Sequence, residues 1–409
     1  MTESATAQIK LLRHKQFALY WWTRVLSTAG YQVIQVAIQW EIYQLTDSAL
    51  HLGIIGLIMF IPVIAGTFII GHVADHYDRR LVIFICNISK ALGAVILLTA
   101  SYTGYLSVGL IYFVVFIVGT GRAFEGPTLH TIVPSIMPQE VLSRAIAAGA
   151  TAHQVAVIGG PALGGFLLVA GTNAVYYVCF AMFVVAAILV MLIRIKRPTK
   201  VKKAVTLESV ISGFTYIKSR PVIFGAITLD LGAVLIGGVT ALLPIFARDI
   251  LDAGPSGLGL LRASPAAGAL LMSFFLSNVQ IDKHAGRIMI GAVVVYGLAT
   301  AVFGFSTSLW LSMLMLAITG AADSVSVVVR HSLVQTRTPN EMLGRVMAVN
   351  STFTGTTSNL GQFEAGLVAA LIGAGPAAVV GGLGAAAIAV LWIKLFPDFW
   401  RVQSVIPEK

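Results

Sequence analysis

Long apolar segments recur from one end of the chain to the other, separated by short polar turns. A helix that spans a membrane needs about 20 mostly apolar residues, and twelve segments approach or exceed that length. They cover residues 17–42, 50–70, 80–101, 106–133, 143–169, 173–194, 221–247, 257–276, 286–304, 308–332, 344–371 and 374–396. A membrane β-barrel would need alternating segments of about ten residues, which the sequence lacks. The pattern predicts an all-α polytopic membrane protein with twelve transmembrane helices.

The second half of the chain repeats part of the first half. "HTIVPSIMPQEVLSRAIAA", from His130, aligns with "HSLVQTRTPNEMLGRVMAV", from His331, at an offset of 201 positions. A parallel repeat of about half the length is typical of secondary transporters, which bind their substrate at mid-membrane between the halves. We therefore predict an N-terminal six-helix bundle over 1–194, a cytoplasmic basic linker over 195–220 and a C-terminal six-helix bundle over 221–409.

The net charge of +10 is a signal of membrane topology, because of where the basic residues lie. Only 11% of the residues are charged, against 57% that are hydrophobic. Lys and Arg collect at both termini and in every second loop, as the positive-inside rule predicts for a cytoplasmic start. The first apolar stretch is long and contains Arg24, so it is expected to be a retained helix. We expect both termini in the cytoplasm.

The basic linker ends in a short amphipathic pattern formed by Leu207, Val210, Ile211, Phe214 and Ile217. Two interpretations stay open. The pattern fits an interfacial helix held at the anionic inner leaflet, and it equally fits a solvated connector between the two bundles.

Polar and ionisable residues inside the apolar segments form stripes at helical spacing. A charged side chain at the bilayer centre costs about 2.5–3.5 kcal/mol on insertion scales, so it normally faces a cavity or a partner. The candidate cavity-lining residues are Arg24, Thr28, Gln32, Gln35, Gln39, Asn350, Thr354 and Thr357. The candidate proton-coupling residues are Glu125, Arg122, Asp323, Arg330, Asp230 and Glu364, with Glu125 beside Arg122 as the first choice. Lys90, in contrast, is expected to extend toward the inner membrane face.

The repeat relates two of these charges. Arg122 maps onto Asp323 at the offset of 201 positions. Opposite charges at equivalent positions suggest the hypothesis that the two halves face each other across the cavity. Exchanging the two residues should then restore what either single neutralisation destroys.

Three motifs resemble those of the major facilitator superfamily. "GHVADHYDRR", at 71–80, resembles its cytoplasmic-loop signature, "RAFEG", at 122–126, its Arg-x-x-x-Gly motif, and "GGPALGG", at 159–165, the Gly-Pro signature of its antiporters. "YQLTDSALHLG" and "RAFEGPTLHTIVPSIMPQEVLSRA" resemble the branch that contains enterobactin exporters and macrolide efflux proteins. The resemblance covers the whole chain. It implies two pseudo-symmetric six-helix bundles, with helices one, four, seven and ten lining a central cavity.

The resemblance also implies a cytoplasmic gate. Asp75 is expected to meet the N-terminus of helix eleven near Arg345, where a carboxylate is stabilised by about 0.3–1 kcal/mol. The full set of gate candidates is Gly71, Asp75, Arg79, Arg80, Asp282, Arg287 and Arg345. For the arginines an alternative stays open, in which they only mark the cytoplasmic side, as the positive-inside rule predicts.

The Gly-Pro motif predicts a special surface on the fifth helix. Gly160 and Gly164 would let another helix approach closely, Pro161 allows a bend, and Gly165 extends the small surface. A hinge that limits leak and plain tight packing are the two interpretations.

Together these features predict a bacterial inner-membrane secondary transporter that exports a siderophore or an amphiphilic drug by alternating access and proton antiport. We expect a small organic substrate, protons and membrane lipids as partners, a monomer, and no nucleic acid, cofactor or bound metal. A proton-coupled importer and a lipid or lysolipid transporter stay open as alternatives. An intramembrane enzyme would need a motif such as His-Glu-x-x-His or Gly-x-Ser-x-Gly, and the sequence contains no such motif. A transporter-like sensor would be expected to carry a large soluble domain, and the sequence contains no such domain.

Overall fold

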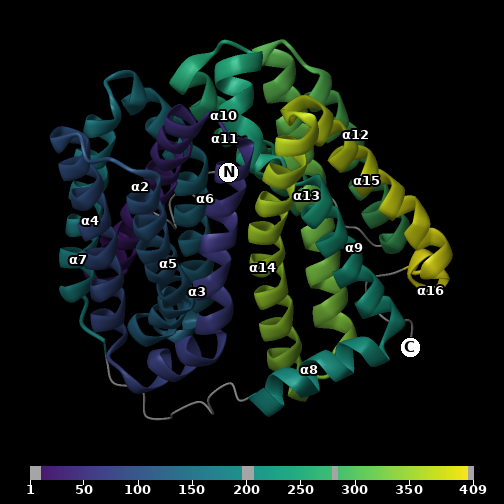
Figure 1. Ribbon diagram of the computed structural model, residues 1–409. Coiled ribbons are helices and arrows are strands. Elements are labelled where there is room, and N and C mark those ends of the chain that lie inside the picture. The colour runs from purple at the N-terminus through teal and green to yellow at the C-terminus, as the bar shows by residue number, and fades with distance from the viewer. Residues whose placement is uncertain (1–10, 196–206, 279–283, 404–409) are drawn as a thin grey trace. The chain divides into compact units, whose positions relative to one another are not determined.

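The computed structural model describes residues 11–195, 207–278 and 284–403, without the side chains at 67–76, 207–210 and 340. The described part of the chain is helical and contains no strand. The long helices are α2 (Lys15–Thr46), α3 (Ala49–His76), α4 (Arg79–Thr103), α5 (Val108–Ile136), α6 (Gln139–Val169), α7 (Thr172–Met191), α9 (Pro221–Gly237), α11 (Gly254–Asn278), α12 (Ala285–Phe305), α13 (Leu309–Arg337), α14 (Asn340–Ile372) and α15 (Ala374–Leu395). Two short helices, α8 (Leu207–Ser219) and α16 (Pro397–Trp400), also appear in Figure 1.

These helices form two compact units. Unit 1 consists of Met1–Leu45 and Ile61–Ala204, and unit 2 consists of Thr46–Phe60 and Val205–Lys409. The first part of α3 therefore belongs to unit 2, where it packs on α14: a Cβ added at Gly53 would lie 3.1 Å from the Cα of Gly366. α8 lies in the predicted linker and packs on α9 and α14 within unit 2. The division into two six-helix bundles stays a prediction.

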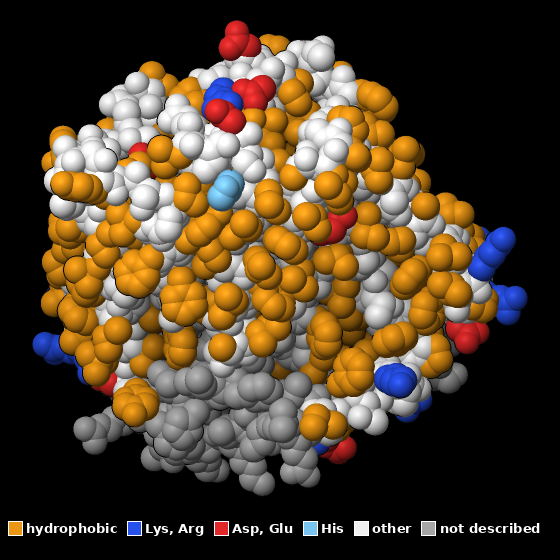
Figure 2. All heavy atoms as spheres, in the orientation of Figure 1, with side chains coloured by type: hydrophobic (Ala, Val, Ile, Leu, Met, Phe, Trp, Pro, Cys, Tyr) orange, Lys and Arg blue, Asp and Glu red, His pale blue; other side chains and the backbone are white. Residues whose placement is uncertain are grey.

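The length and composition of the helices fit a membrane protein. Ten candidate spans are long and apolar enough to cross a bilayer among the described residues. The two remaining long helices, α2 and α14, carry the predicted polar stripes, which lower their hydropathy. Large apolar side chains such as Phe166, Leu271, Trp310 and Leu371 are exposed over more than two thirds of their surface. Figure 2 shows hydrophobic side chains across the visible face, with charged side chains mostly at its margins. A lipid environment is what such a surface requires.

The seventh predicted span, over 221–247, lies within a candidate span at Pro221–Ile250, but its helix is interrupted. α9 ends at Gly237 and is followed by a 3-10 turn (Thr240–Leu242), a short α turn (Leu243–Ile245) and a π turn (Phe246–Ile250). The interruption follows Gly238, which adopts an extended backbone after α9, and Pro244 lacks an N–H group. The hydroxyl of Tyr296 in α12 donates to the Gly237 carbonyl at 3.0 Å, which satisfies a backbone group that the break frees.

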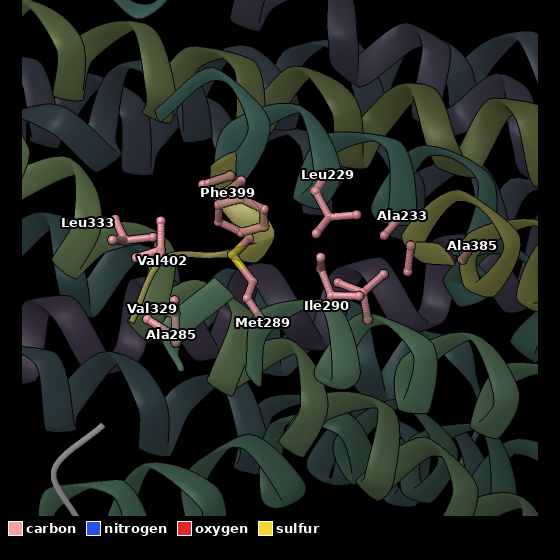
Figure 3. Close-up of a cluster of buried hydrophobic side chains, with 13 residues drawn as sticks. Leu229, Ala233, Ala285, Met289, Ile290, Val329, Leu333, Ala385, Phe399 and Val402 are labelled. Atoms are coloured by element: carbon pink, nitrogen blue, oxygen red, sulfur yellow. The ribbon is translucent and has the colours of Figure 1, made fainter. Parts of the chain in front are cut away.

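The core of unit 2 is built where α9, α12, α13, α15 and α16 meet. Its buried members include Leu229, Met289, Leu333 and Phe399, and Figure 3 shows the Met289 side chain reaching toward the Phe399 ring. Most other members are Ala or Val, so these helices approach closely and form a rigid frame for the polar side chains that α9 and α13 also carry.

Candidate coupling and substrate sites

A fully buried ion pair lies inside unit 1. The Lys90 Nζ on α4 is 2.7 Å from the Glu125 Oε2 on α5, and both side chains are 0% exposed. Three further hydrogen bonds surround the pair. Ser27 on α2 donates to Glu125, Asn87 donates to the Glu125 Oε1 at 3.0 Å, and Lys90 donates to the Ser27 Oγ at 2.6 Å. The carboxylate therefore accepts from three donors, which stabilises its charged form in a dry interior.

This cluster corrects one sequence expectation. Lys90 does not extend to the membrane face; it turns inward because a carboxylate on the neighbouring helix is within reach. Its ammonium also lies 4.9 Å from the centroid of the Phe183 ring. Ser27, Asn87 and Lys90 were missed as members of this site. The sequence does contain an indication of this site, because Asn87 and Lys90 are three residues apart and share one face of α4.

Arg122, the predicted neighbour of Glu125, makes a different contact. Its guanidinium carbon lies 5.2 Å from the centroid of the Tyr31 ring on α2, a cation–π arrangement. It forms no hydrogen bond or ion pair with the described residues. The ion-pair partner of Glu125 is Lys90, and the predicted relation between Arg122 and Asp323 stays a hypothesis.

The polar stripe of α2 is largely buried. Arg24, Thr28, Gln35 and Gln39 are buried, and Gln32 is half-buried. Arg24 donates to the Tyr20 hydroxyl at 2.7 Å, and Gln35 donates to the Tyr31 hydroxyl at 3.0 Å. The Thr28 hydroxyl has no hydrogen-bond partner among the described residues.

The glycines of the Gly-Pro motif bring α6 against this stripe. A Cβ added at Gly160 would lie 2.6 Å from the Gln32 Cβ, and one at Gly164 would lie 3.2 Å from the Val33 Cα. Pro161 and Gly165 are buried in the same helix, which continues through the proline to Val169. The close approach fits the small-residue surface, and the hinge role stays a prediction.

A second charged cluster lies inside unit 2. The Arg330 Nη2 on α13 is 3.3 Å from the Asp230 Oδ2 on α9, and both side chains are buried. Ser326 donates to the Asp230 Oδ1 at 2.7 Å. Arg330 also donates from Nη1 to the Asn350 Oδ1 at 2.7 Å and to the Thr354 Oγ1 at 2.9 Å. The structure thus joins two predicted coupling residues to two predicted cavity-lining residues of α14.

Asp323 lies beside this cluster without joining it. It lines a cavity of about 10 Å³ together with Asp230, Tyr296 and Ser326, which is room for about one water molecule. Asp323 forms no hydrogen bond or ion pair with the described residues. Thr357 is buried and Glu364 half-buried further along α14; within the described part of the chain, no hydrogen bond or ion pair links either side chain to Arg330.

The paired arginines of the loop motif bind the ends of helices in unit 1. Arg79 donates to the Thr131 carbonyl at 3.0 Å and to the Ser135 Oγ at 2.6 Å, in the last turns of α5. Arg80 donates to the Ile193 carbonyl at 3.0 Å, just beyond α7. Both arginines thus attach the loop motif to the C-terminal ends of α5 and α7 by donating to main-chain carbonyls.

The other gate candidates are placed less completely. Gly71 lies in α3, the side chain of Asp75 is not among the described ones, and Asp282 lies outside the described residues. In unit 2, the Arg287 guanidinium carbon lies 5.3 Å from the centroid of the Trp400 ring. Arg345 donates to the Ser212 Oγ on α8 at 3.2 Å. The gate itself stays a prediction.

Asp78 is the N-cap of α4. Its carboxylate accepts from the Arg80 backbone N–H at 2.9 Å and from the Arg80 side chain at 2.7 Å. The Arg80 side-chain hydrogen bond, more than the backbone one, holds the pKa of Asp78 below its ordinary value of 3.8.

We expect Asp78→Ala to lower the free energy of unfolding by about 1 kcal/mol near neutral pH, because the cap of α4 is lost. A carboxyl with a depressed pKa stabilises above its ordinary pKa and loses that contribution as the pH falls through the depressed value. The melting-temperature difference from wild type should therefore persist down to pH 3.8 and shrink below it. Ser107→Ala is the matched control, since Ser107 caps α5 without a titrating group; a pH-independent difference for both variants would contradict the assignment.

An ion pair joins the start of α3 to the π turn in unit 2. Arg248 bonds Asp47 and, from Nε, the Asp249 Oδ1 at 2.7 Å. Asp47 and Arg248 are 201 positions apart, the same offset that relates the two halves of the sequence. Asp47 has a positive φ of 48°, which Asp tolerates better than most residues. The exposed pair fastens the segment before α3 to unit 2.

Comparison with known proteins decides the family. A model of the transmembrane secretion effector family matches residues 6–404. The chain belongs to this family. The family assignment confirms the predicted resemblance to major facilitator transporters and the predicted class of secondary transporter.

Two relatives match this chain from end to end. Enterobactin exporter EntS of Citrobacter koseri is 25% identical over 412 residues, which cover 99% of this chain and 98% of the relative. Enterobactin exporter EntS of Escherichia coli O81 is 24% identical over 413 residues with the same coverage.

Solved structures show the same fold. The nucleoside transporter NupG matches with a TM-score of 0.68 and 15% identity, covering 92% of this chain and 99% of that chain. A D-xylose-proton symporter matches with a TM-score of 0.70 and 13% identity, covering 94% and 98%. At these identities the likeness concerns the fold alone. The predicted twelve-helix fold of a multi-pass membrane protein is confirmed.

Proposed function

We propose that this protein exports a siderophore or an amphiphilic drug across the bacterial inner membrane in exchange for protons. It works by alternating access as a monomer, with both termini in the cytoplasm, and has no catalytic activity. The observation that carries the proposal is the end-to-end match to enterobactin exporters.

We assign the proton-carrying step to Asp323 before Glu125. Glu125 is paired with Lys90 and accepts hydrogen bonds from two further side chains, so protonating it would leave Lys90 charged and unpaired. Asp323 has no such partner, and the groups around it are Asp230, Tyr296, Ser326 and Arg330. Asp323 is therefore the acid whose protonation changes the site with the smallest loss of contacts.

Transport in proteoliposomes under an imposed pH gradient tests the proposal. Enterobactin and amphiphilic drugs are loaded on the side that corresponds to the cytoplasm, and their flux is followed with the gradient in either direction. We expect wild-type flux to accelerate when protons move opposite to the cargo. In Asp323→Asn we expect slow flux that no longer responds to the gradient, because the titrating group is gone.

Two controls separate coupling from structure. Asp398→Asn removes an exposed acid in α16 and should leave the gradient response intact. The double variant with Lys90→Met and Glu125→Gln removes the buried pair of unit 1 as a unit and should also stay coupled. A response that survives in Asp323→Asn refutes the coupling assignment, and flux only toward the cytoplasmic side favours the importer.

A further inference from the structure

A pocket of about 540 Å³ lies in unit 2, away from the charged cluster of Asp230 and Arg330. It opens where α8, the start of α9 and the turn between α13 and α14 meet, near the end of unit 2 where Figure 1 shows α8. Its lining includes Tyr216, Arg220, Val222, Ile223, Arg337 and Thr338. We call it the α8 pocket. Neither the family nor the proposed transport reaction assigns a role to it.

The wall of the α8 pocket is basic. It includes the side chains of Arg220 and Arg337, and no Asp or Glu among the described residues lines it. Tyr216 holds the two sides together. Its hydroxyl donates to the Arg337 carbonyl at 3.3 Å, and its ring lies 5.6 Å from the Arg220 guanidinium carbon. Two arginines in the lining of one pocket favour an anionic ligand.

The first turn of α9 also lines the pocket. α9 begins at Pro221, and its N-cap residue Arg220 makes no side-chain cap hydrogen bond. Proline has no N–H, so the first helical N–H groups are those of Val222 and Ile223, which have no acceptor within the helix. Both residues line the pocket. The start of a helix with free N–H groups binds phosphate-like anions.

An independent feature of the opposite wall also points to a ligand. Thr338 lines the pocket and is only 6% exposed. Its Oγ1 has no hydrogen-bond partner among the described residues. A buried hydroxyl without a partner costs stability, and a phosphate oxygen in the pocket would accept its proton.

We propose that the α8 pocket binds a phosphate group, supplied by the headgroup of an anionic membrane lipid or by free phosphate. Arg220 and Arg337 bind the phosphate oxygens, and Thr338 and the first N–H groups of α9 complete the site. Next to the pocket, α8 exposes the apolar side chains of Ile211 and Phe214, which are suited to contact lipid chains. The proposal does not depend on which cargo the protein exports.

Native mass spectrometry of the purified full-length protein tests the site. Phosphatidylglycerol, phosphatidylcholine and inorganic phosphate are the probes, and thermal melting in detergent verifies that each variant is folded. We expect wild type to retain phosphatidylglycerol in preference to phosphatidylcholine. Arg337→Gln and Arg220→Gln should each weaken retention by about tenfold, since each removes charge-assisted hydrogen bonds. Thr338→Val, which keeps the shape of the side chain, should weaken it less.

A control variant outside the pocket and competition with inorganic phosphate distinguish the possible outcomes. Arg401→Gln removes an exposed arginine of unit 2 outside the pocket and should leave retention unchanged. Retention that inorganic phosphate displaces supports a site that recognises phosphate from either source, and retention that phosphate does not displace supports a lipid site. The proposal is overturned if neither probe binds, or if Arg401→Gln weakens binding as much as the two pocket variants do.

Discussion

Glu125→Gln should lower the free energy of unfolding by about 3–5 kcal/mol, because it leaves the Lys90 ammonium buried without a counter-charge. Both side chains of the pair are 0% exposed, so neither solvent nor lipid headgroups can compensate. Lys90→Met should have an effect of similar size, since it leaves the carboxylate without its cation. Unfolding in detergent micelles, followed by circular dichroism against denaturant, measures the loss.

The double variant with Lys90→Met and Glu125→Gln is the decisive control. It removes both charges and keeps an oxygen that can accept from Asn87 and Ser27, so most of the lost stability should return. Equal melting of wild type and both single variants would show that the pair contributes nothing, contrary to its burial and its hydrogen bonds.

Gly320→Ala should destabilise unit 2 by about 3 kcal/mol or more, because one added methyl group has no room between α11 and α13. A Cβ at Gly320 would lie 1.8 Å from the Pro265 carbonyl oxygen, and one at Gly268 would lie 1.8 Å from the Ala317 carbonyl oxygen. Each neighbour is backbone and cannot rotate away, so the two helices must separate. Melting temperature in detergent is the measurement, and Gly268→Ala should behave alike.

Gly291→Ala is the matched control for this contact. Gly291 lies in α12 of the same unit, and a Cβ there would meet nothing within 4 Å. Alanine is the better helix former, so the control should be as stable as wild type or slightly more stable. Similar losses in all three variants would mean that glycine is needed for a reason other than close helix approach.

The sequence did not predict which charged side chains contact each other. Arg122 and Glu125 are three apart on one helix, which suggested that they act together. Spacing along one helix cannot say which side chain a neighbouring helix presents, and here α4 presents Lys90. Asp230 and Arg330 were both identified as candidates, but their contact depends on the approach of α9 and α13, a hundred residues apart in the chain.

The sequence by itself determined the class of fold and family. A bilayer requires each span to be a long apolar helix, and the repeat appears in the sequence as identical residues at one offset. It also predicted that the polar stripes of α2 and α14 face away from lipid, which stays a prediction. Only the tertiary structure decided the partners within each unit: the pairing of Lys90 with Glu125, the break after Gly237 and the pocket beside α8. Partners are set by packing between helices distant in the chain, and local periodicity carries no information on that packing.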